Sequence, residues 1–264
     1  MGDLVAEVSA VLRESVRECV EGRDVAVAFS GGLDSSLAAA LSKEYARSLR
    51  LYVAGTEGSW DVEAARSAAG IIGADLAVAE ISPDTLIGEL GDSMSVTGTT
   101  SPLILAFEFP LYKVMKACAE GDVIGGQGAD ELFVGYAKYR GADPAFLALR
   151  RREDLRRLKR DVLPHEAALA ANFGKTMHHP YLREDLERLV MSAPLGEIDP
   201  ASDAGKPVLR AVAEELGYGA LAKRPKKAAQ YGSGLMDAIN GICRERGVEY
   251  NALISSLLVP RTEH

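Results

Sequence analysis

The chain has 264 residues, of which 47% are hydrophobic and 26% charged, and its formal net charge is −8. These values are typical of a soluble globular protein with one large domain or two small ones, and they argue against a generally basic nucleic-acid-binding surface. The cysteines (Cys19, Cys118, Cys243) form no Cys-x-x-Cys pair, which excludes a zinc ribbon or a disulfide framework. We see no leader segment and no apolar run long enough for a bilayer, so we expect a cytoplasmic protein without a membrane partner.

Short apolar segments alternate with helical segments through the first half of the chain. We expect strands over 25–29, 51–55, 76–81 and 123–125, and helices over 35–47, 61–72, 83–90 and 102–119. Alternation of this kind predicts an α/β fold with a doubly wound parallel sheet. Ligands of such sheets bind beyond the carboxyl ends of the strands.

The pattern changes after Gly141. We expect helices over 144–161, 164–173, 183–191, 206–216 and 234–246, and we find no convincing strand there. The predicted organisation is therefore an α/β core over 1–142, followed by a helical region over 143–264. We expect the helical region to pack on the core as one integrated domain.

The segment Ser30–Ser36 lies where the first expected strand meets a helix. Gly31 and Gly32 remove side-chain bulk, so a ligand can approach the backbone closely. The helix start offers unpaired N–H donors and the positive end of a dipole, the serines add hydroxyl groups, and Asp34 can hold a divalent cation. The segment predicts a phosphate-binding loop, although it lacks the Gly-x-x-x-x-Gly-Lys-Ser/Thr pattern; the alternative is a plain glycine turn with a helix cap.

Two further glycine-rich segments lie at other expected element ends. Gly125–Tyr136 joins a strand to a helix that begins with adjacent carboxylates, and Lys223–Gly234 runs from a basic cluster into a glycine-rich loop. Each has a simpler interpretation, as a turn before a helix with acidic first residues and as a solvated surface turn. The presence of all three segments in this order favours a functional site.

At these three segments the chain resembles the synthetase half of asparagine synthetase and its relative β-lactam synthetase, within the N-type ATP pyrophosphatases, or PP-loop enzymes. The resemblance extends over most of the chain, through the segments Gly55–Asp61, Thr99–Pro102, His179–Leu182 and Lys206–Arg210. It implies an adenine nucleotide alpha hydrolase-like fold, with ATP and Mg²⁺ as cofactors.

The resemblance also implies site residues by matching positions. For ATP it implies contacts with Phe29, Ser30, Gly31, Gly32, Leu33, Asp34, Ser35, Ser36, Ala54, Gly55, Gly125 and Gly126. Since hard cations prefer carboxylate oxygens, we expect Mg²⁺ on Asp34 and Asp130. For catalysis it implies roles for Lys226, Gln127, Asp130 and Glu131.

The implied activity is that of an ATP-dependent ligase that forms AMP and pyrophosphate while it makes an amide. A carboxylate, aspartate by default, is adenylated and then attacked by ammonia. The chain begins Met1-Gly2-Asp3 and reaches the phosphate loop within a few turns, so we expect no glutaminase domain; a separate glutaminase subunit is the other source of nitrogen.

Gln127 departs from the family, which has glutamate or tyrosine at this position. The change affects the second step, because an amide cannot accept a proton at neutral pH. Either Glu131 or Glu57 would then substitute, or the nucleophile arrives neutral, or the chemistry differs.

Two other functions remain open. One is a PP-loop enzyme that adenylates a different carboxylate or an RNA base, and the other is a nucleotide-binding module without catalysis. We expect no nucleic-acid partner, since the arginines and lysines over 150–160 are best interpreted as the solvated face of a helix. The sequence leaves the oligomeric state open, and a homodimer is one assembly that it allows.

Overall fold

A five-stranded parallel sheet lies at the centre of the computed structural model, which describes residues 2–139, 141–198, 205–223 and 232–257. The strands are β1 (Asp24–Ala28), β2 (Ser48–Gly55), β3 (Leu76–Glu80), β4 (Asp122–Ile124) and β5 (Thr176–His178), in the order β3-β2-β1-β4-β5. The order reverses beside β1, where β2 pairs on one side and β4 on the other. This reversal places the ends of β1 and β4 at the switch point of the sheet, where ligands of doubly wound sheets bind.

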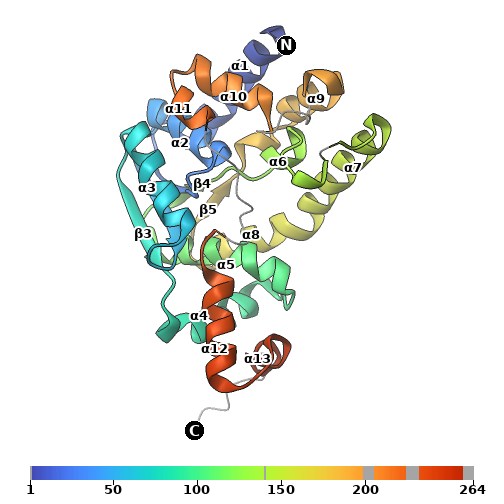
Figure 1. The fold of residues 1–264 in the computed structure, drawn as a ribbon. Helices are drawn as coiled ribbons and strands as arrows, with labels where there is room; N and C mark the ends of the chain where they lie inside the picture. The colour runs from blue at the N-terminus through green and yellow to red at the C-terminus, as the bar shows by residue number, and fades with distance from the viewer. Residues whose placement is uncertain (1, 140, 199–204, 224–231, 258–264) are drawn as a thin grey trace.

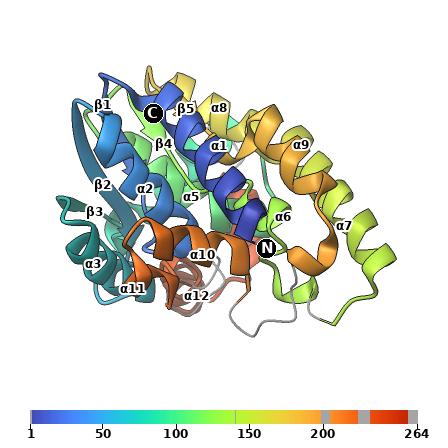
Figure 2. The same cartoon turned by 90° about the horizontal axis from the view of Figure 1, so that it is seen from above.

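Helices cover both faces of the sheet (Figure 1, Figure 2). They are α1 (Gly2–Val20), α2 (Leu33–Tyr45), α3 (Trp60–Ile72), α4 (Pro83–Thr97), α5 (Pro102–Ala117), α6 (Ala129–Leu132), α7 (Pro144–Arg157), α8 (Leu163–Asn172), α9 (Glu184–Ser192), α10 (Pro207–Glu215), α11 (Gly219–Ala222), α12 (Leu235–Arg246) and α13 (Tyr250–Leu257). A single π-helical turn (Leu158–Val162) joins α7 to α8, and a short 3-10 turn, η3 (Pro180–Leu182), follows β5.

Alternate residues of the central strands point to opposite faces. Val25 and Val27 of β1 pack into the main core cluster with α1, α2 and α3, whereas Ala26 between them packs into a second cluster with α5 and α8. Burial of both faces explains why these strands are continuous apolar runs rather than alternating ones. The predicted doubly wound α/β fold is confirmed.

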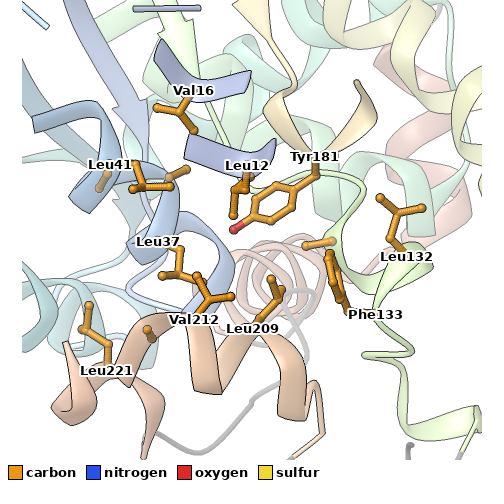
Figure 3. Close-up of a cluster of buried hydrophobic side chains, with 14 of the residues drawn as sticks. Leu12, Val16, Leu37, Leu41, Leu132, Phe133, Tyr181, Leu209, Val212 and Leu221 are labelled. Atoms are coloured by element: carbon orange, nitrogen blue, oxygen red, sulfur yellow. The ribbon is translucent and has the colours of Figure 1, made fainter. Parts of the chain in front are cut away.

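The main core cluster also contains residues from beyond 142. Figure 3 shows Leu209 and Val212 of α10 against Leu37 of α2, with the Tyr181 ring directed into the cluster beside Leu12 of α1. Figure 2 shows α10 and α11 beside α2, and α1 between α2 and α9. The boundary at 142 between a core and a helical region stays a prediction.

The structure corrects three expectations. A strand does follow Gly141, because Thr176–His178 pairs in parallel with β4 and extends the sheet. The helix expected to end at Leu90 continues as α4 to Thr97 and is ended by Gly98, which has a left-handed φ of 68°. Arg151, expected on a solvated helix face, is 2% exposed and donates a hydrogen bond to the carbonyl oxygen of Leu132.

Within the residues that the structure describes, none of the helices has both the length and the apolar character needed to cross a bilayer.

Candidate active site

The loop between β1 and α2 lies tightly against α3. Gly31 has a φ of +70°, in the left-handed region, and a Cβ atom at this position would lie 2.5 Å from the backbone carbon of Ala64. Only glycine satisfies both the backbone conformation and this close approach. The sequence therefore specifies glycine here for the shape of the loop.

The start of α2 presents polar groups to the end of β1. Its cap residue, Gly32, has no side chain that could cap the helix, and the amino terminus of a helix favours an anion. The hydroxyl groups of Ser30 and Ser35 lie 3.3 Å apart, and Ser35 Oγ donates to the carbonyl oxygen of Gly32. This arrangement is suited to phosphate oxygens, as the sequence predicted, and phosphate binding itself stays a prediction.

The loop after β4 contacts the loop after β1 directly. A Cβ atom on Gly126 would lie 2.8 Å from both Asp34 Cβ and Ser35 N, so the two loops approach to within backbone contact. The short helix α6 then begins at Ala129 and carries Asp130 in its first turn. The two expected metal ligands, Asp34 and Asp130, are in this way brought to one place from opposite sides of the switch point.

Both carboxylates converge on one cation, the ammonium group of Lys206. Lys206 Nζ lies 2.5 Å from Asp130 Oδ1 and also bonds Asp34 Oδ2, while the lysine side chain is only 5% exposed. Burial alone would lower the pKa of Lys206, but the charges of Asp34 and Asp130 outweigh burial and raise it, so the lysine is a cation at neutral pH. No role was expected for this lysine from the sequence.

Gly135 makes room for this group of charges. A Cβ atom at position 135 would overlap both Asp130 Oδ1 and Lys206 Cε. The glycine before Tyr136 is thus required by the approach of a lysine from elsewhere in the chain.

The backbone around Lys206 directs its side chain inward. Lys206 caps α10 with a φ of 55°, one of two non-glycine residues with positive φ in the described chain. Arg210, one turn later, donates hydrogen bonds to the carbonyl oxygens of Gly205 and Ala222 and so holds the segment before α10 in place. A left-handed lysine costs about 1 kcal/mol or more and persists only where its surroundings fix it.

A second buried polar cluster contacts Gln127 and includes Glu166 and His179. Gln127 Nε2 donates a hydrogen bond of 2.9 Å to Glu166 Oε1 on α8, and His179 Nε2 lies 3.4 Å from Glu166 Oε2. Burial raises the pKa of Glu166 to about 8, with repulsion from Glu108 adding to it, whereas the pKa of His179 falls to about 4. At neutral pH this cluster therefore holds mainly a protonated carboxyl group and a neutral imidazole.

Glu108 of α5 completes the cluster. It is 1% exposed, neither of its carboxyl oxygens has a hydrogen-bond partner in the described chain, and His165 Nδ1 lies 3.7 Å from Oε1. Burial raises the pKa of Glu108 to about 8. Neither Glu108 nor Glu166 was singled out from the sequence.

The other expected site residues are distributed as follows. Phe29 and Ala54 are buried at the ends of β1 and β2, in the two core clusters on either face of the sheet. Glu131 is buried and accepts a hydrogen bond of 2.5 Å from the Tyr136 hydroxyl group, which ties it to its own loop. Glu57 is exposed in the loop after β2.

Lys226 lies outside the described residues. After β2, Thr56 N donates a hydrogen bond to the carbonyl oxygen of Ser233, and Asp61 N, at the start of α3, donates one to that of Gly232. The chain around residues 232–234 therefore lies beside the loop of β2.

The sequence of residues 7–170 matches the profile of the family described as "Asparagine synthase". This chain belongs to the asparagine synthase family. A relative from Methanocaldococcus jannaschii, "Putative asparagine synthetase [glutamine-hydrolyzing] 1", is 28% identical over 89% of this chain and 51% of its own length. "Asparagine synthetase [glutamine-hydrolyzing] 1" of Bacillus subtilis is 35% identical over 52% of this chain and 22% of its own length. The chain thus spans about half of one of these asparagine synthase relatives and about a fifth of the other.

Solved structures resemble this asparagine synthase family member more distantly. NMN synthetase from Francisella tularensis gives a TM-score of 0.45 at 15% identity, over 97% of this chain and 85% of its own. NH3-dependent NAD synthetase from Campylobacter jejuni gives a TM-score of 0.34 at 14% identity, over 86% of this chain and 98% of its own.

Proposed function

We propose that the chain is an ATP-dependent ligase that makes an amide in two steps, with AMP and pyrophosphate as products. In the first step a substrate carboxylate attacks the α-phosphorus of ATP, the bond to the β-phosphate oxygen breaks, and pyrophosphate leaves. In the second step a nitrogen nucleophile attacks the acyl carbon, loses a proton, and releases AMP. Membership of the asparagine synthase family supports this proposal.

One observation carries the proposal: two loops from opposite sides of the switch point bring Asp34 and Asp130 onto a single cation. The uncapped first turn of α2 lies in the same loop and offers N–H groups for phosphate oxygens. A nucleotide and its counter-ion together require hydrogen-bond donors for the phosphates and carboxylate ligands for the cation, at one place.

The donor set fits the Mg²⁺ ion that such chemistry uses. Asp34 and Asp130 are carboxylates, which are the protein ligands that Mg²⁺ prefers, and they already converge on one positive charge. When bound, Mg²⁺ would neutralise charge that collects on the leaving pyrophosphate. Lys206 lies within the same group and adds a fixed positive charge for the phosphates, and we propose the same role for Lys226 from the resemblance.

Glu166 is our candidate for the proton acceptor of the second step. Gln127 stands where the family has a group that takes up a proton, and its amide cannot do so. Its Nε2 donates to Glu166, so the acidic group in contact with this position is a carboxyl with a pKa raised to about 8. Glu131, one of the two substitutes that the sequence offered, instead accepts a hydrogen bond from Tyr136 within its own loop.

We propose aspartate as the default acyl substrate and ammonia as the nucleophile, supplied free or by a separate subunit. Because Gln127 departs from the family, the alternative is a different carboxylate or a different small amine as substrate, and a substrate screen would distinguish these from aspartate and ammonia.

Exchange of labelled pyrophosphate into ATP tests the first step in isolation. The chain is incubated with MgATP and labelled pyrophosphate, together with each acid of a panel of small carboxylic and amino acids. We expect exchange that depends on one acid, and its loss in Asp34→Asn and Asp130→Asn. No exchange with any acid, in protein shown to be folded by circular dichroism, would overturn the proposal. Exchange with an acid other than aspartate would overturn only the substrate.

A further inference from the structure

Lys206 occupies the position between the two carboxylates that we propose as magnesium ligands. Its Nζ bonds Asp34 Oδ2 and lies 2.5 Å from Asp130 Oδ1, so one oxygen of each carboxylate is directed at the ammonium group. The side chain is 5% exposed, and the charge is therefore screened weakly by solvent. In this structure the cation between Asp34 and Asp130 belongs to the protein itself.

The lysine is built into this place. Its backbone has the left-handed conformation, and Arg210 fixes the preceding carbonyl oxygen of Gly205 at 2.7 Å. Its stem passes Gly135 so closely that any side chain there would overlap Lys206 Cε. Three separate features thus hold the ammonium group at the carboxylates.

A divalent ion placed on the same two carboxylates would lie close to this ammonium group. Two positive charges at contact distance repel each other strongly in a partly buried site. The repulsion falls when negatively charged phosphates enter, because the phosphates can accept the ammonium group on one side and the metal ion on the other.

We propose that Lys206 is a built-in counter-cation that keeps divalent metal ions off Asp34 and Asp130 until a nucleotide binds. The protein then takes up its metal ion together with the nucleotide rather than before it. The inference deepens the proposed function and rests on it, since it assumes that these two carboxylates are the metal ligands.

Mn²⁺ is a suitable probe, because its free form is measured directly by electron paramagnetic resonance. Without nucleotide, we expect wild-type protein to bind Mn²⁺ weakly at this site. We expect the dissociation constant to fall by about tenfold or more in Lys206→Met, because a unit charge at contact distance is removed. The gain should disappear in the double variant Lys206→Met with Asp130→Asn. A non-hydrolysable ATP analogue should tighten Mn²⁺ binding in the wild type.

Two controls keep the outcome interpretable. Lys113→Met removes another buried lysine that is paired with a carboxylate, Glu89 at 2.8 Å, and should bind Mn²⁺ as the wild type does. Lys206→Gln keeps a hydrogen-bond donor without the charge and replaces Lys206→Met if that variant fails to fold, as judged by circular dichroism.

The inference is overturned if nucleotide-free wild type binds Mn²⁺ as tightly as the folded Lys206 variants, or if their added binding survives Asp130→Asn. Because Mn²⁺ binding is measured without turnover, this result is separate from pyrophosphate exchange. Exchange in the wild type, with equal Mn²⁺ binding in all variants, would leave the proposed function standing and remove only the role of Lys206. If exchange failed but the Lys206 variants gained a Mn²⁺ site that needs Asp130, the role of Lys206 would stand and the proposed function would be removed.

Discussion

The Tyr181 hydroxyl group donates a hydrogen bond of 3.0 Å to the main-chain oxygen of Asp34. Tyr181 is fully buried in the main core cluster, on the short turn that follows β5, and Asp34 lies in the first turn of α2. The turn is held in its own place because Ser15 of α1 donates to the carbonyl oxygen of Pro180 at 2.7 Å. The segment predicted to bind phosphate is therefore held by a hydrogen bond from the turn at residues 180–182, which lies far along the chain.

Tyr181→Phe should weaken the loop without opening a cavity. The change leaves the Asp34 carbonyl oxygen without this donor, and we expect a loss of about 1–2 kcal/mol in the free energy of unfolding. We also expect a higher KM for ATP in pyrophosphate exchange. Urea denaturation and exchange kinetics measure the two effects.

Tyr112→Phe is the matched control for this prediction. Its hydroxyl group donates to Asp92 at 3.4 Å, between α5 and α4, away from the loop after β1. It should alter stability without altering the KM for ATP. An unchanged KM in Tyr181→Phe as well would show that the hydrogen bond has no part in shaping the loop.

Gly135→Ala should disrupt the group of charges at Asp130 and Lys206. The added methyl group would overlap both side chains, so one of them must move. Overpacking of this kind costs about 1–3 kcal/mol, and displacing catalytic groups by about 1 Å lowers rates on the order of 100-fold. We expect both effects, measured by thermal unfolding and by pyrophosphate exchange. Gly88→Ala, in α4 with no atom within 4 Å of the new Cβ, should keep full exchange activity and gain stability.

The parts of the site that are local in sequence could be predicted. β1 and the carboxyl half of β2 are apolar runs because both of their faces are buried, and the loops that follow them contain the glycines that these loops need. Gly31 lies in a Gly-Gly pair at a strand-to-helix junction, which is enough to predict a close backbone approach.

The parts that depend on distant contacts could not be predicted from local patterns. β5 has three residues, Thr176–His178, that are partly exposed, so no apolar run marks it. Lys206 contacts Asp34 across 172 positions, and Tyr181 contacts it across 147. The only signals were the motifs in which Lys206 and Tyr181 stand, and Glu166 stands in none that we identified.

The free energy of unfolding should fall with rising pH because of the buried carboxyl group of Glu108. Burial raises its pKa from 4.5 to about 8, so the folded state keeps a proton that the unfolded chain has released. The stabilising contribution is complete below pH 4.5 and is lost as the pH rises through about 8. Glu108→Gln removes this loss and should exceed the wild type in stability at high pH, by an amount on the order of a few kcal/mol.

Urea denaturation of both proteins at several values between pH 4 and pH 9 would measure this difference. Glu7→Gln, on the exposed surface of α1, reports the effect of net charge alone. Parallel stability curves for wild type and Glu108→Gln would contradict the prediction. Since Glu108 also repels Glu166, the same variant should lower the pKa of Glu166.

Glu166→Gln should separate the two steps of the proposed reaction. Exchange of pyrophosphate needs no proton acceptor for the nitrogen and should stay within a few-fold of the wild type, whereas amide formation should fall by about 100-fold or more. At a fixed concentration of the unprotonated amine, the wild-type rate of amide formation should rise with pH up to about 8, where Glu166 loses its proton, and this rise should vanish in the variant. Quenched-flow assays with ammonia, at the same pH for both proteins, measure pyrophosphate release and amide formation separately. An equal loss in both would instead assign Glu166 to the structure of the loop at Gln127, because a proton acceptor acts only after the acyl-adenylate has formed.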